Sequence, residues 1–205
     1  TNCIVGPLSR FFGLKSVAKA SLADNDLHGI GESLAGKIHR AFLKQIHTCV
    51  ATSRDLEREF LMSGVSRNHV VFLPNGVDTE RFRAAVPEER NELRRKLNLP
   101  IEGPIALTVG VFDNRKNIGW LMEQWAANNA FGTGALLLAV GPRAREDVNG
   151  SYLAGLHALA ARFPTILRIQ EPVENIEMYY RAVDFFILPS RNEGLPNVLL
   201  EAMAC

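Results

Sequence analysis

Two carboxylates, Glu193 and Glu201, lie eight positions apart near the C-terminal end of this 205-residue chain. The apolar residues around Glu201 predict a helix that is largely buried, where a carboxylate is costly unless it is hydrogen-bonded. Pro196 suits the first turn of this helix, whose unpaired amides favour an anion such as a phosphate. Carboxylates that bind hydroxyls and amides that bind a diphosphate would together make a sugar-nucleotide site. The alternative is that Glu201 complements the helix dipole, which is worth about 0.3–1 kcal/mol, while Glu193 is a solvated loop residue.

A second group of charged residues lies between a predicted strand and a predicted helix, in the segment 110–117. Asn117 is the expected N-cap, which places Arg115 and Lys116 at the positive end of the helix dipole, where two cations are mildly repelled. An anionic ligand would reverse that effect, since Arg offers bidentate contacts to a phosphate and Lys a point charge. The alternative is that both side chains extend into solvent.

Short apolar runs alternate with segments of helical periodicity along the chain, and this alternation predicts an α/β fold with a parallel, doubly wound sheet. Residues 185–188 are expected to form a strand covered on both faces. The predicted strands are residues 15–21, 48–52, 69–73, 105–109, 135–140, 165–169 and 184–188. The predicted helices are residues 37–46, 55–62, 87–97, 117–127, 152–162, 174–181 and the segment after Pro196.

Several local signals complete this scheme. Residues 1–13 are predicted to be a loop, because Gly6-Pro7 and Gly13 interrupt them. Ser53 is the predicted N-cap of the helix 55–62, and Gly64 is predicted to stop it. A polar turn or helix entry is expected at residues 23–26, and Asn75-Gly76 predicts a sharp turn.

The segments Pro189-Ser190 and 193–205 resemble the E-x7-E signature of retaining GT-B glycosyltransferases, and most closely that of glycosyltransferase family 4, or group 1. The resemblance implies a GT-B fold with a Rossmann-like parallel sheet in the donor domain. It also implies that Glu193 and the amides after it hold the donor sugar, and that Glu201 holds the ribose. The implied donor-binding residues are Gly110, Arg115, Lys116, Gly141, Val173, Glu193, Gly194, Leu195, Pro196, Asn197, Val198 and Glu201.

The segment from Gly110 to Asn117 is similar to the diphosphate-binding loop of this family, so Arg115 and Lys116 are expected to stabilise the leaving phosphates. Many members have an Arg directly after the glycine, where this chain has Val111. Gly141 is expected to bring backbone close to the nucleotide, although a plain strand-ending turn explains it nearly as well. Residues 170–173 are expected beside the base.

The catalytic residues stay unassigned. The family often carries a His at the end of a strand in its N-terminal domain, and the corresponding position here is expected to be Ser21. His28 follows a few residues later and is only a weak substitute. Since retaining members are thought to rely on the leaving phosphate to take the acceptor proton, positioning matters more than any one side chain.

Asn75 and Gly76 lie where the family's chain crosses between its two domains, so both are expected to form the hinge. Residues 1–76 are accordingly interpreted as the C-terminal part of the acceptor-side Rossmann-like domain. Residues 77–205 are interpreted as the donor-binding domain, truncated at its end. Both domains are expected to be incomplete, as in an internal fragment.

Composition limits the other possibilities. The net charge of +1 argues against broad nucleic-acid binding, and three widely spaced cysteines are neither a disulfide framework nor a metal cluster. They fit a reducing compartment, and no apolar run approaches the roughly 20 residues that span a bilayer. The predicted helix 37–46, with Ile38, Phe42 and Ile46 on one face, is basic. A solvated face is its default interpretation, and peripheral contact with an anionic membrane is the alternative.

The leading hypothesis is a cytoplasmic enzyme that transfers a hexose from a UDP- or GDP-sugar to a saccharide or lipid-linked acceptor with retention of configuration. No cofactor or metal is expected. A sugar-nucleotide epimerase, a phosphorylase and a non-catalytic nucleotide-sugar-binding module are the alternatives. The donor sugar, base, acceptor and linkage stay open, and the fragment is not expected to be active alone.

Overall fold

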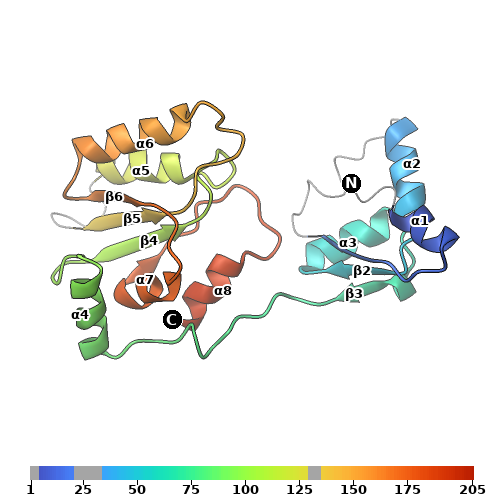
Figure 1. Cartoon of the computed structure of the whole chain (residues 1–205), viewed down its shortest axis with the longest axis horizontal. Helices are drawn as coiled ribbons and strands as arrows, with labels where there is room; N and C mark the ends of the chain where they lie inside the picture. The colour runs from blue at the N-terminus through green and yellow to red at the C-terminus, as the bar shows by residue number, and fades with distance from the viewer. Residues whose placement is uncertain (1–4, 21–33, 129–134) are drawn as a thin grey trace. The chain divides into compact units, whose positions relative to one another are not determined.

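The computed structural model describes residues 5–20, 34–128 and 135–205 (Figure 1). The expected turn at residues 23–26, Ser21 and His28 therefore lie outside the described residues. The chain divides into two compact units. The N-terminal unit comprises Thr1–Gly76 with Asn192–Pro196, and the C-terminal unit comprises Val77–Arg191 with Asn197–Cys205.

The N-terminal unit contains a parallel sheet with the strand order β1-β2-β3. Ala18 pairs with Cys49, and Cys49 pairs with Val70, so the three strands are in register across the sheet. The helical and strand elements are α1 (Val5–Phe11), β1 (Val17–Ala20), α2 (Leu34–Leu43), β2 (Thr48–Ala51), α3 (Arg54–Met62), the 3-10 helix η1 (Arg67–His69) and β3 (Val70–Phe72).

The caps of α3 follow the sequence prediction. The Ser53 side chain accepts a hydrogen bond from Leu56 N at 3.3 Å, which satisfies one unpaired amide of the first turn. Gly64, with φ of +82°, follows the last turn in the left-handed conformation that glycine adopts at helix ends. Leu56 and Phe60 then point from α3 into a core that also contains Cys49.

Two predictions for this unit are wrong. Residues 5–11 form a helix instead of a loop, because Gly6 lets α1 approach α2 so closely that a Cβ there would lie 2.4 Å from Phe42 O. Ile38 is 45% exposed instead of facing the core. Ile46 of the predicted apolar face does lie in the core, and Leu43 lies there with it.

The C-terminal unit contains a second parallel sheet, with the strand order β6-β5-β4-β7. The prediction of an α/β fold with parallel sheets is confirmed. The elements of the C-terminal unit are α4 (Pro87–Lys96), β4 (Ile105–Val109), α5 (Ile118–Asn128), β5 (Leu136–Val140), α6 (Ser151–Arg162), β6 (Leu167–Gln170), α7 (Ile176–Ala182), β7 (Phe185–Phe186) and α8 (Asn197–Ala204).

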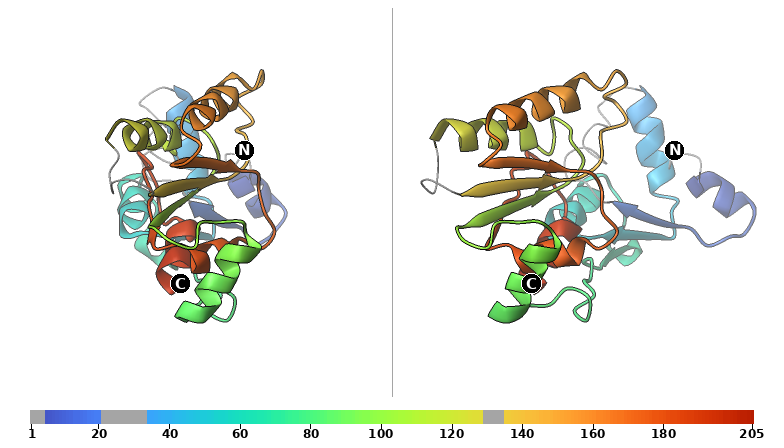
Figure 2. Two further views of the ribbon diagram at one scale, coloured as in Figure 1. Left: turned by 90° about the vertical axis from the view of Figure 1, so that its left-hand side faces the viewer. Right: turned by 60° about the vertical axis from the view of Figure 1, so that its left-hand side comes forward.

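Helices cover both faces of this sheet (Figure 2). Because side chains alternate along a strand, Leu137 and Ala139 of β5 face the core under α5 and α6, whereas Leu136 and Leu138 face the core on the side of α4 and α7. The strand order reverses between β4 and β7. In a doubly wound sheet the crevice beyond the carboxyl ends of two such strands is the usual ligand site.

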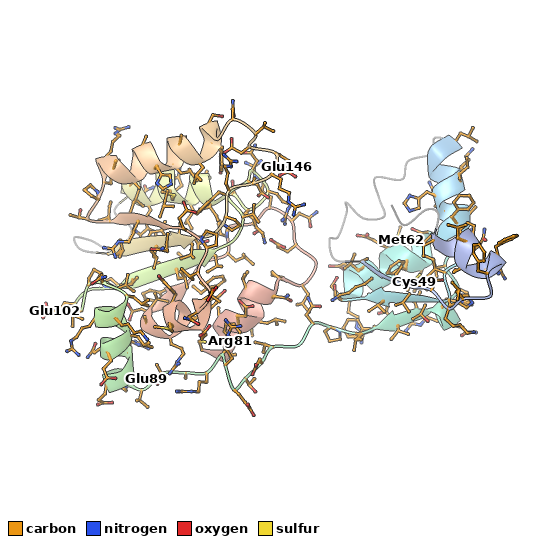
Figure 3. All side chains as sticks on the ribbon, in the orientation of Figure 1. Cys49, Met62, Arg81, Glu89, Glu102 and Glu146 are labelled. Atoms are coloured by element: carbon orange, nitrogen blue, oxygen red, sulfur yellow. The ribbon has the colours of Figure 1, made fainter. Side chains whose placement is uncertain are left out.

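Ion pairs attach two parts of this unit to α7: the segment that follows Gly76, and helix α4. Arg81, labelled in Figure 3, donates from Nε to Glu177 Oε2 at 2.9 Å and from its terminal nitrogen to Glu174 O at 2.8 Å. Glu89 of α4, also labelled, pairs with Arg181 of α7. These contacts fix the helices on one side of the sheet.

A buried arginine joins α4 to β7. Arg94 is 4% exposed and donates to Asp184 Oδ2 at 2.7 Å and to Ala182 O at 2.8 Å. The same carboxylate oxygen accepts from Ile105 N at 2.7 Å. Asp184, which also pairs with Arg90 of α4, therefore links α4, the start of β4 and the start of β7, and keeps the two strands at the reversal in register.

Two expectations about the C-terminal end are wrong. The predicted strand 184–188 is reduced to β7, whose Phe185 is 46% exposed, because β7 is an edge strand among the described residues. Helix α8 contains no buried residue, and Met203 is 76% exposed. Ala202, Ala204 and the following Cys205 pack against the core, since α8 contacts α7 on one side.

Candidate functional site

Backbone hydrogen bonds join the chain segments at the carboxyl ends of β4 and β5. Gly110 N donates to Val140 O at 3.0 Å, and Phe112 N donates to Pro142 O at 2.9 Å. A Cβ on Gly141 would lie 1.8 Å from Gly110 O, so no other residue fits there without displacing the strand end. Gly141 is therefore required for the shape of this edge, which is more than an ordinary strand-ending turn requires.

The loop after β4 is held in a fixed turn by a residue that the sequence analysis did not single out. Asp113 accepts a hydrogen bond from Lys116 N at 2.6 Å. The aliphatic part of Lys116 lies 3.3–3.5 Å from the position that a Gly110 Cβ would occupy, so this glycine leaves room for the lysine chain. Arg115 and Lys116 are both half-buried, which does not fit the alternative that they simply extend into solvent.

Asn117 lies directly before α5, as the sequence predicts. Its carbonyl accepts from Leu121 N at 3.2 Å, which begins the helical hydrogen-bond pattern. Its φ of 57° is left-handed, a conformation that asparagine tolerates better than most residues. The turn 114–117 thus reverses the chain between β4 and α5.

The loop after β7 contacts the loop after β4. Arg191 N donates to Arg115 O at 2.9 Å, and Ile187 N donates to Leu107 O at 2.9 Å, which extends the strand contact. Between them, Ser190 Oγ is buried and has no hydrogen-bond partner among the described residues. Since buried hydroxyls are usually satisfied, an unsatisfied one here suits a site that accepts a ligand.

Residues 193–196 belong to the segment that groups with the N-terminal unit. Within that group, Asn75 Nδ2 donates to Leu195 O at 3.0 Å, and Asn75 Oδ1 accepts from Lys19 Nζ at 2.8 Å. Glu193, Gly194, Leu195 and Pro196 are all half-buried.

The predicted sharp turn at Asn75-Gly76 is wrong, because residues 73–78 form no turn and Gly76 lacks a positive φ. The chain turns directly afterwards, where Asp78 Oδ1 accepts from Glu80 N at 3.0 Å and from Arg81 N at 3.1 Å. Whether Asn75 and Gly76 act as a hinge stays a prediction.

Glu201 has an internal partner that the sequence analysis missed. The Tyr180 hydroxyl donates to Glu201 Oε2 at 3.1 Å. Tyr180 is 5% exposed, and its burial, together with the negative charge of Glu201, raises the pKa of the phenol far above its ordinary value. The phenol therefore stays protonated and orients one oxygen of the carboxylate, while the half-buried side chain keeps its other oxygen for a second partner.

The remaining predicted residues fall into two groups. Asn197 and Val198 open α8, with Asn197 exposed. Val173 is half-buried against the core of the C-terminal unit. The structure therefore brings together Gly110, Lys116 and Gly141, and it ties Arg115 to the loop after β7. It places Glu201 on α8, against α7.

Two negative findings apply to the described residues. No group of three or more His, Cys, Asp and Glu side chains in residues 5–20, 34–128 and 135–205 could hold a metal ion. In the same part of the chain, every helix is too short or too polar to cross a membrane.

Solved structures share the fold of this chain. Anabaena HepE in complex with UDP is 16% identical, with a TM-score of 0.79 over 99% of this chain and 54% of that chain. WaaG, a glycosyltransferase involved in lipopolysaccharide biosynthesis, is 18% identical, with a TM-score of 0.70 over 94% of this chain and 54% of that chain. The fold is therefore that of GT-B glycosyltransferases.

The sequence comparisons then identify the family. Residues 103–205 match the model of the glycosyl transferases group 1, and the chain belongs to that family. A D-inositol 3-phosphate glycosyltransferase of Streptomyces bingchenggensis is 32% identical over 69% of this chain and 32% of its own length. A GDP-mannose-dependent monoacylated alpha-(1-6)-phosphatidylinositol monomannoside mannosyltransferase of Corynebacterium glutamicum is 28% identical over 97% of this chain and 54% of its own length. The chain spans about half or less of the curated relatives it matches.

Proposed function

We propose that the protein containing this chain transfers a hexose from a UDP- or GDP-sugar to a saccharide or lipid-linked acceptor, with retention of anomeric configuration. The observation that carries the proposal is the backbone contact between Gly110 and Gly141 beside the half-buried Lys116, at the carboxyl ends of β4 and β5 and next to the reversal of strand order between β4 and β7. Two relatives support the donor class by their names, since one is solved with UDP-glucose and another is GDP-mannose-dependent.

The donor diphosphate would lie over the loop after β4. Arg115 and Lys116 supply positive charge there, while Gly110 leaves room for the Lys116 chain and Gly141 leaves room for Gly110 O, which fixes the shape of the loop. In the reaction the bond between the anomeric carbon and the diphosphate oxygen breaks. The two cations would stabilise the negative charge that develops on that oxygen.

The two glutamates would hold the rest of the donor. Glu201, with one oxygen bound by Tyr180, would accept a hydrogen bond from a ribose hydroxyl, and Glu193 with residues 194–198 would hold the sugar. The acceptor hydroxyl oxygen then bonds to the anomeric carbon on the face that the diphosphate leaves, and its proton passes to the leaving phosphate. This scheme uses no metal or other cofactor and depends on positioning.

The location of the protein is part of the same proposal. We expect it to act in the cytoplasm, with peripheral membrane contact through α2 as the alternative to a solvated helix. The exposed Lys37 on that helix and the exposed Lys44 directly after it support such a contact.

Calorimetric titration of the full-length protein with UDP and with GDP tests the donor site. We expect Lys116→Ala and Glu193→Ala each to weaken binding of the preferred nucleotide sugar by about 10–100-fold, because a hydrogen bond to a charged group contributes about 1.5–3 kcal/mol. Lys96→Ala and Glu92→Ala remove the same groups from exposed positions on α4 and should leave the affinity unchanged. Unchanged affinity in both site variants would refute the proposal.

Product analysis tests the reaction itself. With donor and acceptor present, NMR of the purified product should show the anomeric configuration of the donor. An inverted product would refute retention, and isomerised donor or a sugar phosphate formed without an acceptor would indicate an epimerase or a phosphorylase.

A further inference from the structure

A groove of about 660 Å³ lies between α5 and α6, within the C-terminal unit. Its volume is in the range of about 300–1,000 Å³ that is typical of small-molecule sites. It is lined by α5 residues including Trp120 and Glu123, by α6 residues including Tyr152, Gly155 and Arg162, and by Asn114 of the preceding turn. None of these residues is named above as donor-binding, and the groove adjoins the proposed donor site through Asn114 and Asn117 of the loop after β4 and Arg191 of the loop after β7.

An exposed tryptophan lines this groove. Trp120 is 52% exposed, whereas Trp125, five residues further along α5, is 4% exposed in the core. A large aromatic face open to water in a concave site is a common anchor for a ligand with an apolar face. A pyranose ring has such a face, formed by its axial C–H groups, while its hydroxyls point outward around the rim.

The polar side chains around Trp120 suit those hydroxyls. The groove offers the Glu123 carboxylate, the Asn114 amide and the Arg162 guanidinium, so donors and acceptors are both present. The helix N-terminus beside it is not a phosphate site. Asp147 already accepts from Tyr152 N at 3.2 Å and from Leu153 N at 3.1 Å.

Two glycines shape the groove. A Cβ on Gly119 would lie 2.8 Å from the Tyr152 hydroxyl and 3.2 Å from a Leu156 methyl carbon, so this glycine lets α5 and α6 close together at the floor. A Cβ on Gly155 would meet no atom within 4 Å, so the groove is open above α6. The groove is therefore closed between α5 and α6 at Gly119 and open at Gly155, with Trp120 on one side and polar side chains around its opening.

We propose that the groove between α5 and α6 binds an oligosaccharide, with one pyranose stacked on Trp120 and its hydroxyls hydrogen-bonded to Glu123, Asn114 and Arg162. This binding needs no nucleotide and is separate from transfer at the donor site. Such a site would retain a glycan chain on the surface of the enzyme between catalytic events.

Tryptophan fluorescence of the full-length protein tests this proposal. The chain holds two tryptophans, and only Trp120 is exposed, so Trp125→Phe makes Trp120 the main reporter within this chain. Titration with maltohexaose, cellohexaose and α-1,6-mannohexaose should give a saturable blue shift with at least one of them, at millimolar affinity. Calorimetry on the unmutated protein should give the same dissociation constant.

Two variants of different chemistry locate the binding. Trp120→Ala should weaken binding of that hexasaccharide at least about tenfold, which corresponds to about 1.4 kcal/mol. Gly155→Leu fills the open part of the groove without strain and should weaken hexasaccharide binding to a similar extent. Misfolding would not explain that loss, since leucine suits a helix interior better than glycine.

Lys116→Ala separates this site from the donor site and should leave hexasaccharide affinity unchanged. The proposal is overturned if no hexasaccharide shifts the emission, if Gly155→Leu binds normally, or if Lys116→Ala abolishes binding. It is also overturned if the Trp120 emission shifts with protein concentration alone, because the exposed ring would then mark a contact between copies of the chain.

Discussion

Replacing Gly141 by alanine should destabilise the C-terminal unit far more than any ordinary Gly→Ala change. The new Cβ would lie 1.8 Å from Gly110 O, whereas ordinary van der Waals contact begins at 3.4 Å, so the two strand ends must separate by about 1.6 Å. Neither atom belongs to a flexible side chain, and the backbone itself must therefore move.

This separation would break two hydrogen bonds, from Gly110 N to Val140 O and from Phe112 N to Pro142 O. A hydrogen-bonding group left unpaired in a buried place costs about 1–3 kcal/mol, so we expect Gly141→Ala to lower the free energy of unfolding by about 2–4 kcal/mol. Because the same displacement moves the loop after β4, donor affinity should fall as well.

Urea unfolding followed by tryptophan emission is the assay. Both tryptophans of the chain lie on α5, so within this chain the signal reports the C-terminal unit. Gly155→Ala is the matched control, since its Cβ would meet no atom within 4 Å and it lies inside α6. It should raise stability by about 0.5–1 kcal/mol. Equal stability of the two variants would refute the reasoning.

Three further substitutions test single contacts. Tyr180→Phe removes the hydrogen bond to Glu201 while keeping the ring, so unfolding in urea should show a free energy of unfolding lower by about 1 kcal/mol. An unchanged free energy of unfolding, together with unchanged donor affinity, would mean that this hydrogen bond does not orient the Glu201 carboxylate. Asp113→Ala removes the hydrogen bond that Asp113 accepts from Lys116 N. Calorimetric titration should then show weaker nucleotide binding, while the unfolding midpoint of the N-terminal unit stays unchanged. Glu57 has a pKa below its ordinary value, because Arg54 donates to it at 2.7 Å. Its contribution to stability is therefore complete above about pH 4.3 and is lost as the pH falls through the lower folded-state value, so circular dichroism should show a weaker acid dependence for Glu57→Gln.

The alternation of strands and helices was predictable because its signals are local. Buried runs such as residues 105–109 and 136–140 are apolar almost throughout, which is typical of strands covered on both faces. The N-cap Ser53 and the stop at Gly64, which follows the last turn of α3, were predictable for the same reason, since each depends on residues within one turn. Parallel sheets with helices on both faces follow from this alternation.

The predictions that failed depend on distant residues. Helix α1 forms across Gly6-Pro7 because the missing Cβ admits Phe42 O, which comes from another helix. Asn75 makes no sharp turn, since its side chain is held by Lys19 and by the Leu195 carbonyl, 56 and 120 positions away. The residue types at these positions are compatible with both conformations, so only the tertiary contacts decide.

The candidate site shows the same division between local and distant signals. Arg115, Lys116 and Gly141 could be singled out because each follows a buried strand, and the carboxyl ends of parallel strands share one edge. Tyr180 could not, because nothing near it in the sequence refers to Glu201, 21 positions later.

The strand order itself decides what the site contains. The pairing β6-β5-β4-β7 puts β7 beside β4, although β7 is the last strand in the chain, and the ion pair of Arg94 with Asp184 fixes this register. If β7 instead extended the sheet beyond β6, Arg191 could not donate to Arg115 O, and the loops after the first and last strands of this unit would not meet. The basic loop is therefore positioned by a pairing between distant strands, which the residues of the loop alone do not specify.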